Sequence, residues 1–539
     1  MNFLGHCRKL ITRRGIWLSR RCYSRIEQLK TERRSMCPTD LIRRGAVFGI
    51  YYDPKNTVNP YGKLTETAEK FNQRVCGRME EMLFVAGMPV KKGEIRTLFD
   101  LDPDLCAIVI VGLGEECQGY DIAERMDEGK EAIRQAAALG CQELQRLNTK
   151  IIYVESFGHA ESAAEGASLG SWIYQTHLSK EKQLIIPDLI LYEDCDWTGW
   201  QIGLQKAAAQ NLTRQLMETP ANELTPSMCA QNAVEILCKS GINVEVKVKA
   251  WAETLNMNAF VAASKGSCEP PIFLEISYYG AHREERPVVL IGKGLTFNSG
   301  GINLKSCDGM RLMRGDMAGA ANVIAVCRAV ASLELPINVR GLIPLCENMP
   351  GCSAMRPGDI VHAMNGKSIE IENTRNAGRL ILADALVYAQ TFWPRFILDV
   401  GTMTEDVYRG LGTGACGVFT NSETLWKYME AASMHTGDRV WRLPLWNHFT
   451  HLITHRENVD VRTQGDEYGE SCKVAAFLNE FVPCGEWIHL DTYGVMYEDG
   501  DDPKYLRQGM SGRPTRTLIE FLSQMVCQRP DEEKPNKPC

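Results

Sequence analysis

The chain has 539 residues, too many for one ordinary hydrophobic core, so we expect two or three domains. Its hydrophobic fraction is 44%, and because no apolar run approaches the length of a membrane helix, about eighteen residues, we expect no membrane span. The formal net charge is −7, and the body that follows the basic N-terminus is more acidic still, which argues against a nucleic acid partner because such a body repels a phosphate backbone.

Residues 1–25 have the composition of a targeting peptide. The first 23 residues include Lys and Arg but no Asp or Glu, and Phe3, Leu4, Leu10 and Ile11 recur at helical spacing. A basic amphipathic helix of this kind is typical of a mitochondrial transit peptide. We therefore predict a mitochondrial location, and the alternative is an uncleaved basic extension of a cytoplasmic protein.

The 20 cysteines are scattered along the chain. They form no CxxC pair and no Cys/His cluster with zinc spacing, and a disulfide scaffold would need a far higher cysteine density in a shorter chain. This distribution favours reduced thiols in an intracellular protein.

Residues 45–205 predict an N-terminal α/β domain. Short apolar runs at 107–111 and 150–154 indicate strands, and the pattern over 131–147 indicates a helix. A boundary is expected near 201–211, in a helical pattern that stops before a Thr-Pro pair.

Residues 206–527 predict a second α/β domain with a central sheet flanked by helices, so the fold class is α/β with two domains of this kind. Residues 528–539 are charged and rich in proline, and we expect them to be disordered. The expected strands of the second domain are 287–291, 337–343, 396–400 and 487–490, and the expected helices are 316–332 and 380–389.

Three motifs in the second domain carry a family resemblance. Residues 291–301 read IGKGLTFNSGG, 313–321 read MRGDMAGAA and 373–380 read NTRNAGRL. Together and in this order they resemble the metal-site motifs of the leucyl aminopeptidase family, peptidase family M17 of the cytosol aminopeptidase type, whose third motif reads NTDAEGRL. The resemblance is strong over residues 205–527, and the first domain resembles the family only in size and pattern.

The resemblance implies a two-metal hydrolase site. In the family, one Lys, three Asp and one Glu hold two divalent cations, commonly zinc, manganese or magnesium, which activate a water and polarise the scissile carbonyl. A second Lys stabilises the oxyanion, and an Arg positions a bicarbonate that acts as general base. On this pattern the chain keeps Lys293 and Asp316 as metal ligands, and Lys305 and Arg379 stand in the catalytic places.

Three ligand positions depart from the family pattern. Asn298 and Arg375 stand where the family has Asp, and Ala377 stands where it has Glu. Alanine has no donor atom and arginine stays cationic in proteins, so no pH restores the ligand set. The three changes raise the formal charge by four, which equals the charge of two divalent cations. We therefore hypothesise that the Arg375 guanidinium occupies the vacated metal cavity and pairs with Asp316.

The expected substrate pocket also departs from the family. Met313 keeps its place at the pocket wall and Thr402 begins the segment beside it, but Glu405 stands where the family has Gly and Tyr493 where it has Ala. Both changes add bulk where a substrate side chain would bind. The alternative to a catalytic role is a structural one, in which the four retained site residues serve only as members of a buried salt-bridge network. These residues are Lys293, Asp316, Lys305 and Arg379.

These observations favour a leucyl aminopeptidase homologue with a degraded metal site, inactive and serving a structural or assembly role. We expect no cofactor, and a homo-hexamer or a mixed hexamer with active paralogues, as the family resemblance implies. A basic N-terminus with an eroded site resembles the sperm leucyl aminopeptidase group of mitochondria. The alternative is an active aminopeptidase that uses two divalent cations (Mn, Zn or Mg) and bicarbonate to release apolar N-terminal residues from peptide substrates. Binding of peptides without hydrolysis is disfavoured by Glu405 and Tyr493.

Overall fold

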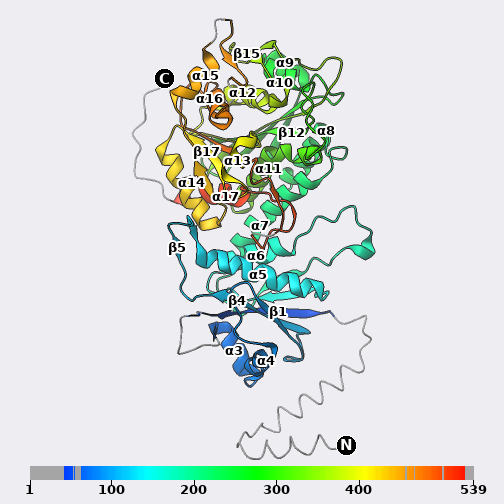
Figure 1. Ribbon diagram of the computed structural model, residues 1–539, viewed down its shortest axis with the longest axis vertical. Helices are drawn as coiled ribbons and strands as arrows, with labels where there is room; N and C mark the ends of the chain where they lie inside the picture. The colour runs from blue at the N-terminus through cyan, green and yellow to red at the C-terminus, as the bar shows by residue number, and fades with distance from the viewer. Residues whose placement is uncertain are drawn as a thin grey trace, which may run out of the picture.

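The computed structural model describes residues 42–52, 54, 62–455, 458–465, 468–500 and 503–527 (Figure 1). Within these ranges the chain forms two α/β units, each with a sheet between layers of helices, which confirms the predicted fold class. The predicted transit segment 1–25 and the predicted disordered tail 528–539 lie outside the described residues. No described helix combines the length and the apolar character needed to cross a membrane.

The N-terminal sheet has the order β3-β4-β1-β7-β8, with β2 paired to β1. Strands β4, β1, β7 and β8 are parallel, and β3 is antiparallel to β4. All eight residues of β4 are buried, as expected for a parallel strand covered on both faces. The bounds are β1 Arg44–Tyr51, β2 Lys63–Leu64, β3 Ile95–Leu98, β4 Ala107–Gly114, β7 Ile151–Val154 and β8 Asp188–Leu191.

Four helices cover this sheet. Helices α5 (Glu128–Arg146) and α6 (Ala160–Ser171) lie between the sheet and the second unit, and α3 (Glu66–Arg74) and α4 (Arg78–Ala86) cover the outer face (Figure 1). The structure confirms the strands predicted at 107–111 and 150–154 as β4 and β7, and the helix predicted at 131–147 as α5. Helix α5 begins three residues before the predicted start because Asp127 caps it, accepting a hydrogen bond from the Lys130 amide at 3.0 Å.

Helix α7 (Trp197–Glu218) connects the two units, packing against α6 on one side and α11 (Ala318–Ser332) on the other. It ends at Glu218, before Thr219 and Pro220, as the helix-stop signal predicted. The boundary expected near 201–211 lies inside this single helix, so the division at residue 205 stays a prediction.

The larger sheet has nine strands in the order β18-β17-β20-β16-β11-β13-β10-β9, with β12 paired to β13. The strands predicted at 287–291, 337–343, 396–400 and 487–490 are confirmed as β11, β13, β16 and β20, which run parallel at its centre. The bounds are β9 Asn243–Val248, β10 Ile272–Tyr279, β11 Val288–Gly292, β12 Gly294–Asn298, β13 Asn338–Asn348, β16 Ile397–Gly401, β17 Cys416–Thr420, β18 Val440–Arg442 and β20 Trp487–Asp491.

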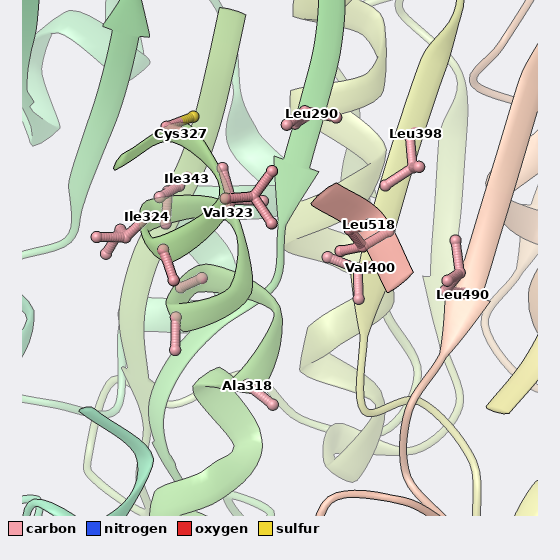
Figure 2. Packing of buried hydrophobic residues seen from close by; sticks show 14 of the residues in the cluster. Leu290, Ala318, Val323, Ile324, Cys327, Ile343, Leu398, Val400, Leu490 and Leu518 are labelled. Carbon is pink, nitrogen blue, oxygen red and sulfur yellow. The ribbon is translucent and has the colours of Figure 1, made fainter. Parts of the chain in front are cut away.

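Two hydrophobic cores cover the faces of this sheet. One packs α11 and α17 (Thr515–Cys527) against the strands, and Figure 2 shows Val323, Leu290 and Leu518 within it. The other packs α12 (Ala377–Ala389) and α16 (Glu470–Asn479) against the opposite face. The helices predicted at 316–332 and 380–389 are thus confirmed as α11 and α12, and the 3-10 helix η2 (Met310–Met317) leads into α11.

The remaining elements surround these cores or form short ribbons at the surface. They are β5 Tyr120–Asp121, β6 Met126–Asp127, η1 Lys180–Lys182, α8 Pro226–Cys238, α9 Lys249–Thr254, α10 Asn258–Ser264, β14 Asp359–His362, β15 Ser368–Ile371, η3 Thr374–Asn376, η4 Gln390–Phe392, α13 Glu405–Leu411, α14 Glu423–Thr436, α15 Asn447–Thr454, β19 Val461–Arg462, β21 Tyr497–Glu498 and β22 Gly509–Met510.

Buried ion pairs join the two units. Glu165 of α6 accepts from Arg134 Nε of α5 at 2.6 Å and from Arg516 of α17 at 2.8 Å, and Arg516 also reaches Asp438 at 3.2 Å. These four side chains, which we call the interdomain cluster, are all nearly inaccessible to solvent. Because burying an unpaired charge is costly, the mutual pairing favours one fixed arrangement of the two units.

Candidate metal and substrate site

The residues predicted for the site gather at the carboxyl ends of the central strands. Lys293 follows β11, Asn298 ends β12, and Asp316 lies near the end of η2 at the start of α11. Arg375 lies in η3, and Arg379 lies in the first turn of α12. In sheets of this type, loops beyond the strand ends converge, which is why residues far apart in the sequence meet here.

Lys293 and Asp316 form a buried ion pair, with Lys293 Nζ 2.6 Å from Asp316 Oδ1. Lys293 also donates to the carbonyl of Thr402, whose hydroxyl donates to Asp316. Burial raises the pKa of Asp316, but the cations of Lys293 and Lys305 and the hydrogen bonds it accepts outweigh burial and hold its pKa below the ordinary value. Asp316 is therefore ionised and paired inside the protein.

Asn298 turns its amide nitrogen toward the same carboxylate. Its Nδ2 donates to Asp316 Oδ2 at 2.8 Å, and its Oδ1 accepts from the Gly300 amide at 3.0 Å and from Asn348 Nδ2 at 2.9 Å. Both Asp316 oxygens thus accept hydrogen bonds from protein donors. We call Lys293, Asp316 and Asn298 the site cluster.

The hypothesis that Arg375 pairs with Asp316 is wrong. The Arg375 side chain is exposed, and its guanidinium donates to the carbonyls of Asn303 at 2.8 Å and Leu304 at 2.6 Å. Asp316 finds its cation in Lys293 instead, because that side chain extends from a buried strand end directly to it. Ala377, the first residue of α12, is buried in the core and brings no polar side-chain atom.

Lys305 lies close to the site cluster and contacts the predicted pocket wall. Its Nζ is 2.8 Å from Met313 Sδ. Burial lowers the pKa of Lys305, the cations of Lys293 and Arg375 add to this effect, and the carboxylates of Asp316 and Glu405 oppose it, so the net shift is downward. The structure therefore brings Lys305 and Met313 together.

Arg379 has protein partners at both ends of its guanidinium. One terminal nitrogen donates to the Thr463 carbonyl and the other pairs with Glu470 Oε1. Burial lowers the pKa of Arg379, and the Glu470 carboxylate opposes the shift. Sequence reasoning missed Glu470, because it is 91 residues from Arg379 along the chain and belongs to none of the recognised motifs.

Glu405 and Tyr493 meet beside the site. Glu405 begins α13, Tyr493 follows β20, and the Tyr493 hydroxyl donates to Glu405 Oε1 at 3.4 Å. Burial raises the pKa of Tyr493, and the neighbouring carboxylates of Glu405 and Asp316 raise it further. The two residues predicted to add bulk to the pocket thus contact each other. Thr402, the other pocket residue, contacts the site cluster as described above.

A separate group of potential metal ligands lies between the units. Among the described residues, the ligand atoms of Glu161, His435 and Glu520 lie within 4.8 Å of one another. The ammonium of Lys206 stands among them, 2.5 Å from Glu161 and 2.6 Å from Glu520. Lys130 Nζ lies 2.8 Å from His435 Nδ1. This group contains none of the predicted site residues, and a lysine already supplies its cation.

Comparison with known proteins gives consistent matches over both units. A model of the cytosol aminopeptidase family catalytic domain matches residues 211–519, and a model of the family's N-terminal domain matches residues 55–181. Cytosol aminopeptidase of Bos taurus is 46% identical over 483 residues, covering 89% of this chain and 92% of that protein. Cytosol aminopeptidase of Homo sapiens is 46% identical over 493 residues, covering 91% and 94%.

Solved structures agree with this assignment. The bottromycin maturation enzyme BotP in complex with Mn is 29% identical, with a TM-score of 0.76, covering 90% of this chain and 100% of that one. Fold and matches together define a two-domain protein of the metallo-aminopeptidase class. The chain belongs to the cytosol aminopeptidase family, peptidase family M17. Members of this family normally use divalent metal ions and are generally oligomeric.

Proposed function

We propose that this chain is an inactive leucyl aminopeptidase homologue with a degraded two-metal site, serving as a structural or assembly protein. The observation that carries the proposal is the state of Asp316, a retained ligand position. One of its oxygens accepts from Lys293 at 2.6 Å and the other from Asn298 Nδ2 at 2.8 Å. A metal ligand must offer a lone pair to the ion, and these lone pairs face protein hydrogens instead.

The donor set as a whole does not fit two divalent cations. Hard cations need several oxygen ligands, and two-metal hydrolase sites hold their ions with shared carboxylates. Here Asn298 presents an N–H group to the site, Ala377 has no donor, and Arg375 adds a fixed positive charge nearby. Coulomb repulsion between a guanidinium and a divalent ion opposes binding at any dielectric constant.

An assembly role fits the retained fold. Oligomer interfaces and catalytic sites are separate surfaces, so a chain can lose its catalysis and keep its architecture. We propose a homo-hexamer or a mixed hexamer with active paralogues, located in the mitochondria of sperm, on the basis of the basic segment 1–25 and the degraded site.

The alternative is an active aminopeptidase that releases apolar N-terminal residues. It is favoured by identity of 46% to proteins named cytosol aminopeptidase, and that name also fits a cytoplasmic location. On this alternative Lys293, Asp316, Lys305 and Arg379 would keep their family roles with two divalent cations and bicarbonate.

The decisive experiment measures metal content and turnover on one sample. The purified chain is loaded with manganese or zinc, its metal is quantified by mass spectrometry, and leucine anilide hydrolysis is assayed. We expect less than one ion per chain and no turnover, with both partly restored in the triple variant Asn298→Asp, Arg375→Asp, Ala377→Glu.

A charge-matched control separates ligand chemistry from overall charge. Lys70→Glu with Lys249→Glu changes the net charge by the same amount on exposed helices and should restore neither metal nor turnover. Two tightly bound ions with manganese-dependent turnover in the unmodified chain would overturn the proposal and establish the alternative.

A further inference from the structure

The buried guanidinium of Arg379 already has an anion from its own chain. Arg379 is 2% exposed, yet it extends from the first turn of α12 to the Glu470 carboxylate. A buried guanidinium without a counter-charge is strongly destabilising, whereas one that pairs with a carboxylate is tolerated. The need of Arg379 for an anionic partner is therefore met inside the protein.

The fold fixes the position of Glu470. Glu470 is the first residue of α16, which packs with α12 in one hydrophobic core, and its backbone amide donates to Asp406 Oδ2 at 3.0 Å. Its side chain is 28% exposed, so the carboxylate approaches Arg379 from the solvent side. An external anion would have to reach the guanidinium past this carboxylate or displace it.

We propose that the Glu470 carboxylate takes the place on Arg379 that an external oxyanion such as bicarbonate would need, so that the site carries its own anion. The inference deepens the proposed function, since both concern the retained site residues. A carboxylate and a bicarbonate present the same planar pair of oxygens to a guanidinium. A tethered group competes at an effective concentration of millimolar or more, which excludes a weakly bound free anion. Bicarbonate therefore does not fit this site.

Anion rescue of a cavity variant tests the proposal. Glu470→Ala removes the carboxylate and leaves space beside Arg379, whereas Glu470→Gln removes the charge and keeps the volume. Thermal unfolding of the full-length chain is followed with EDTA present, at constant ionic strength, with sodium chloride replaced stepwise by sodium bicarbonate, acetate or formate.

We expect both variants to unfold at lower temperature than the unmodified chain. Acetate, formate or bicarbonate should raise the Tm of Glu470→Ala saturably, by about 2–4 °C, because a bound anion stabilises the folded state. The unmodified chain and Glu470→Gln should not respond beyond the chloride control. A saturable response of the unmodified chain, or none in Glu470→Ala, would overturn the proposal.

A second measurement covers the case in which Glu470→Ala does not fold. Carbon-13 bicarbonate is titrated onto the unmodified chain and observed by NMR. A bound resonance that acetate displaces would overturn the proposal, and its absence supports it. Because both tests run without metal and without substrate, the proposal can survive even if leucine anilide turnover refutes the inactive assignment.

Discussion

The interdomain cluster and the site cluster are both buried groups of charged side chains, but they are neutralised differently. In the interdomain cluster, two arginines share the Glu165 carboxylate, and Arg516 also reaches Asp438. In the site cluster, one lysine and one neutral amide, helped by the Thr402 hydroxyl, satisfy a single carboxylate. The first is built from opposite charges that hold two units together, whereas the second stands where the family resemblance predicts metal ligands.

The two clusters should differ in how much stability a substitution costs. Removing one member of the interdomain cluster takes an ion-pair partner from two buried charges at once, so its members depend on one another. The site cluster has one ion pair, and Lys293 would keep the Thr402 carbonyl as an acceptor if its carboxylate were lost. We therefore expect substitutions in the interdomain cluster to cost more stability than substitutions in the site cluster.

The largest effect is expected for Arg516→Leu. The change leaves Glu165 with Arg134 as its one cation and Asp438 with Arg513 as its one cation, both in the nearly dry interior. We expect a loss of about 3–5 kcal/mol in the free energy of unfolding, measured by chemical denaturation. Lys70→Met, which breaks an exposed pair with Glu66, is the control and should leave the free energy of unfolding nearly unchanged. Equal losses in the two variants would contradict the contrast.

Glu155 is a buried carboxyl with no cation partner among the described residues, and the pH dependence of stability extends the comparison to it. Glu155 accepts from the Gly49 amide and the Thr65 hydroxyl, each at 2.9 Å, and burial raises the pKa of Glu155 to about 7. Because the folded state binds this proton more tightly than the unfolded state, stability falls as pH rises from about 4.5 to about 7, by about 3 kcal/mol.

The pH prediction is checked by denaturation across that window. Glu155→Gln should lose this component of the pH dependence. The free energy of unfolding of the variant, relative to that of the unmodified chain, should therefore be higher at pH 8 than at pH 4. Asp316 behaves in the opposite sense: its pKa is lowered, so its contribution is present above its unfolded pKa and is lost only in acid. An unchanged pH profile in Glu155→Gln would show that the carboxyl is not buried as described.

A smaller loss is expected for Asp316→Asn. The ion pair with Lys293 disappears, but the amide oxygen can still accept one hydrogen bond, and Lys293 keeps the Thr402 carbonyl. We expect a loss of about 2 kcal/mol by chemical denaturation, less than for Arg516→Leu. If a metal ion were instead the main partner of Asp316, the difference between the variant and the unmodified chain would disappear in EDTA.

Much of the fold could be predicted from the sequence because strong periodic patterns decide secondary structure. The runs 396–400 and 487–490 are apolar except for Asp399 and His489, which suits strands buried on both faces. The structure brings Lys293, which follows β11, to Asp316 of η2. The predicted boundary fell inside α7 because one continuous helix packs against both units.

The side-chain partners in the site were much harder to predict. Charge counting placed four additional positive charges in the site but could not say which cation faces Asp316, because that depends on where each side chain points. The contact of Glu470 with Arg379 could not be predicted for a different reason. Glu470 belongs to no motif, and only tertiary packing of α16 against α12 brings it to Arg379. Composition and spacing identify the chemical groups, but the fold decides which of them meet.

The smallest effect is expected for Arg375→Ala, and it separates the two accounts of this residue. In the structure the guanidinium is exposed, and among the described residues it donates to the carbonyls of Asn303 and Leu304 alone, which water can hydrate once the side chain is removed. The loss should therefore stay below about 1 kcal/mol, measured by denaturation beside Asp316→Asn. A double variant of Arg375→Ala and Asp316→Asn should give the sum of the single losses, since the residues share no direct contact. Coupling of more than about 1 kcal/mol between them would restore the idea that Arg375 neutralises the former metal cavity, and would place the compensating charge inside the site and not at its rim.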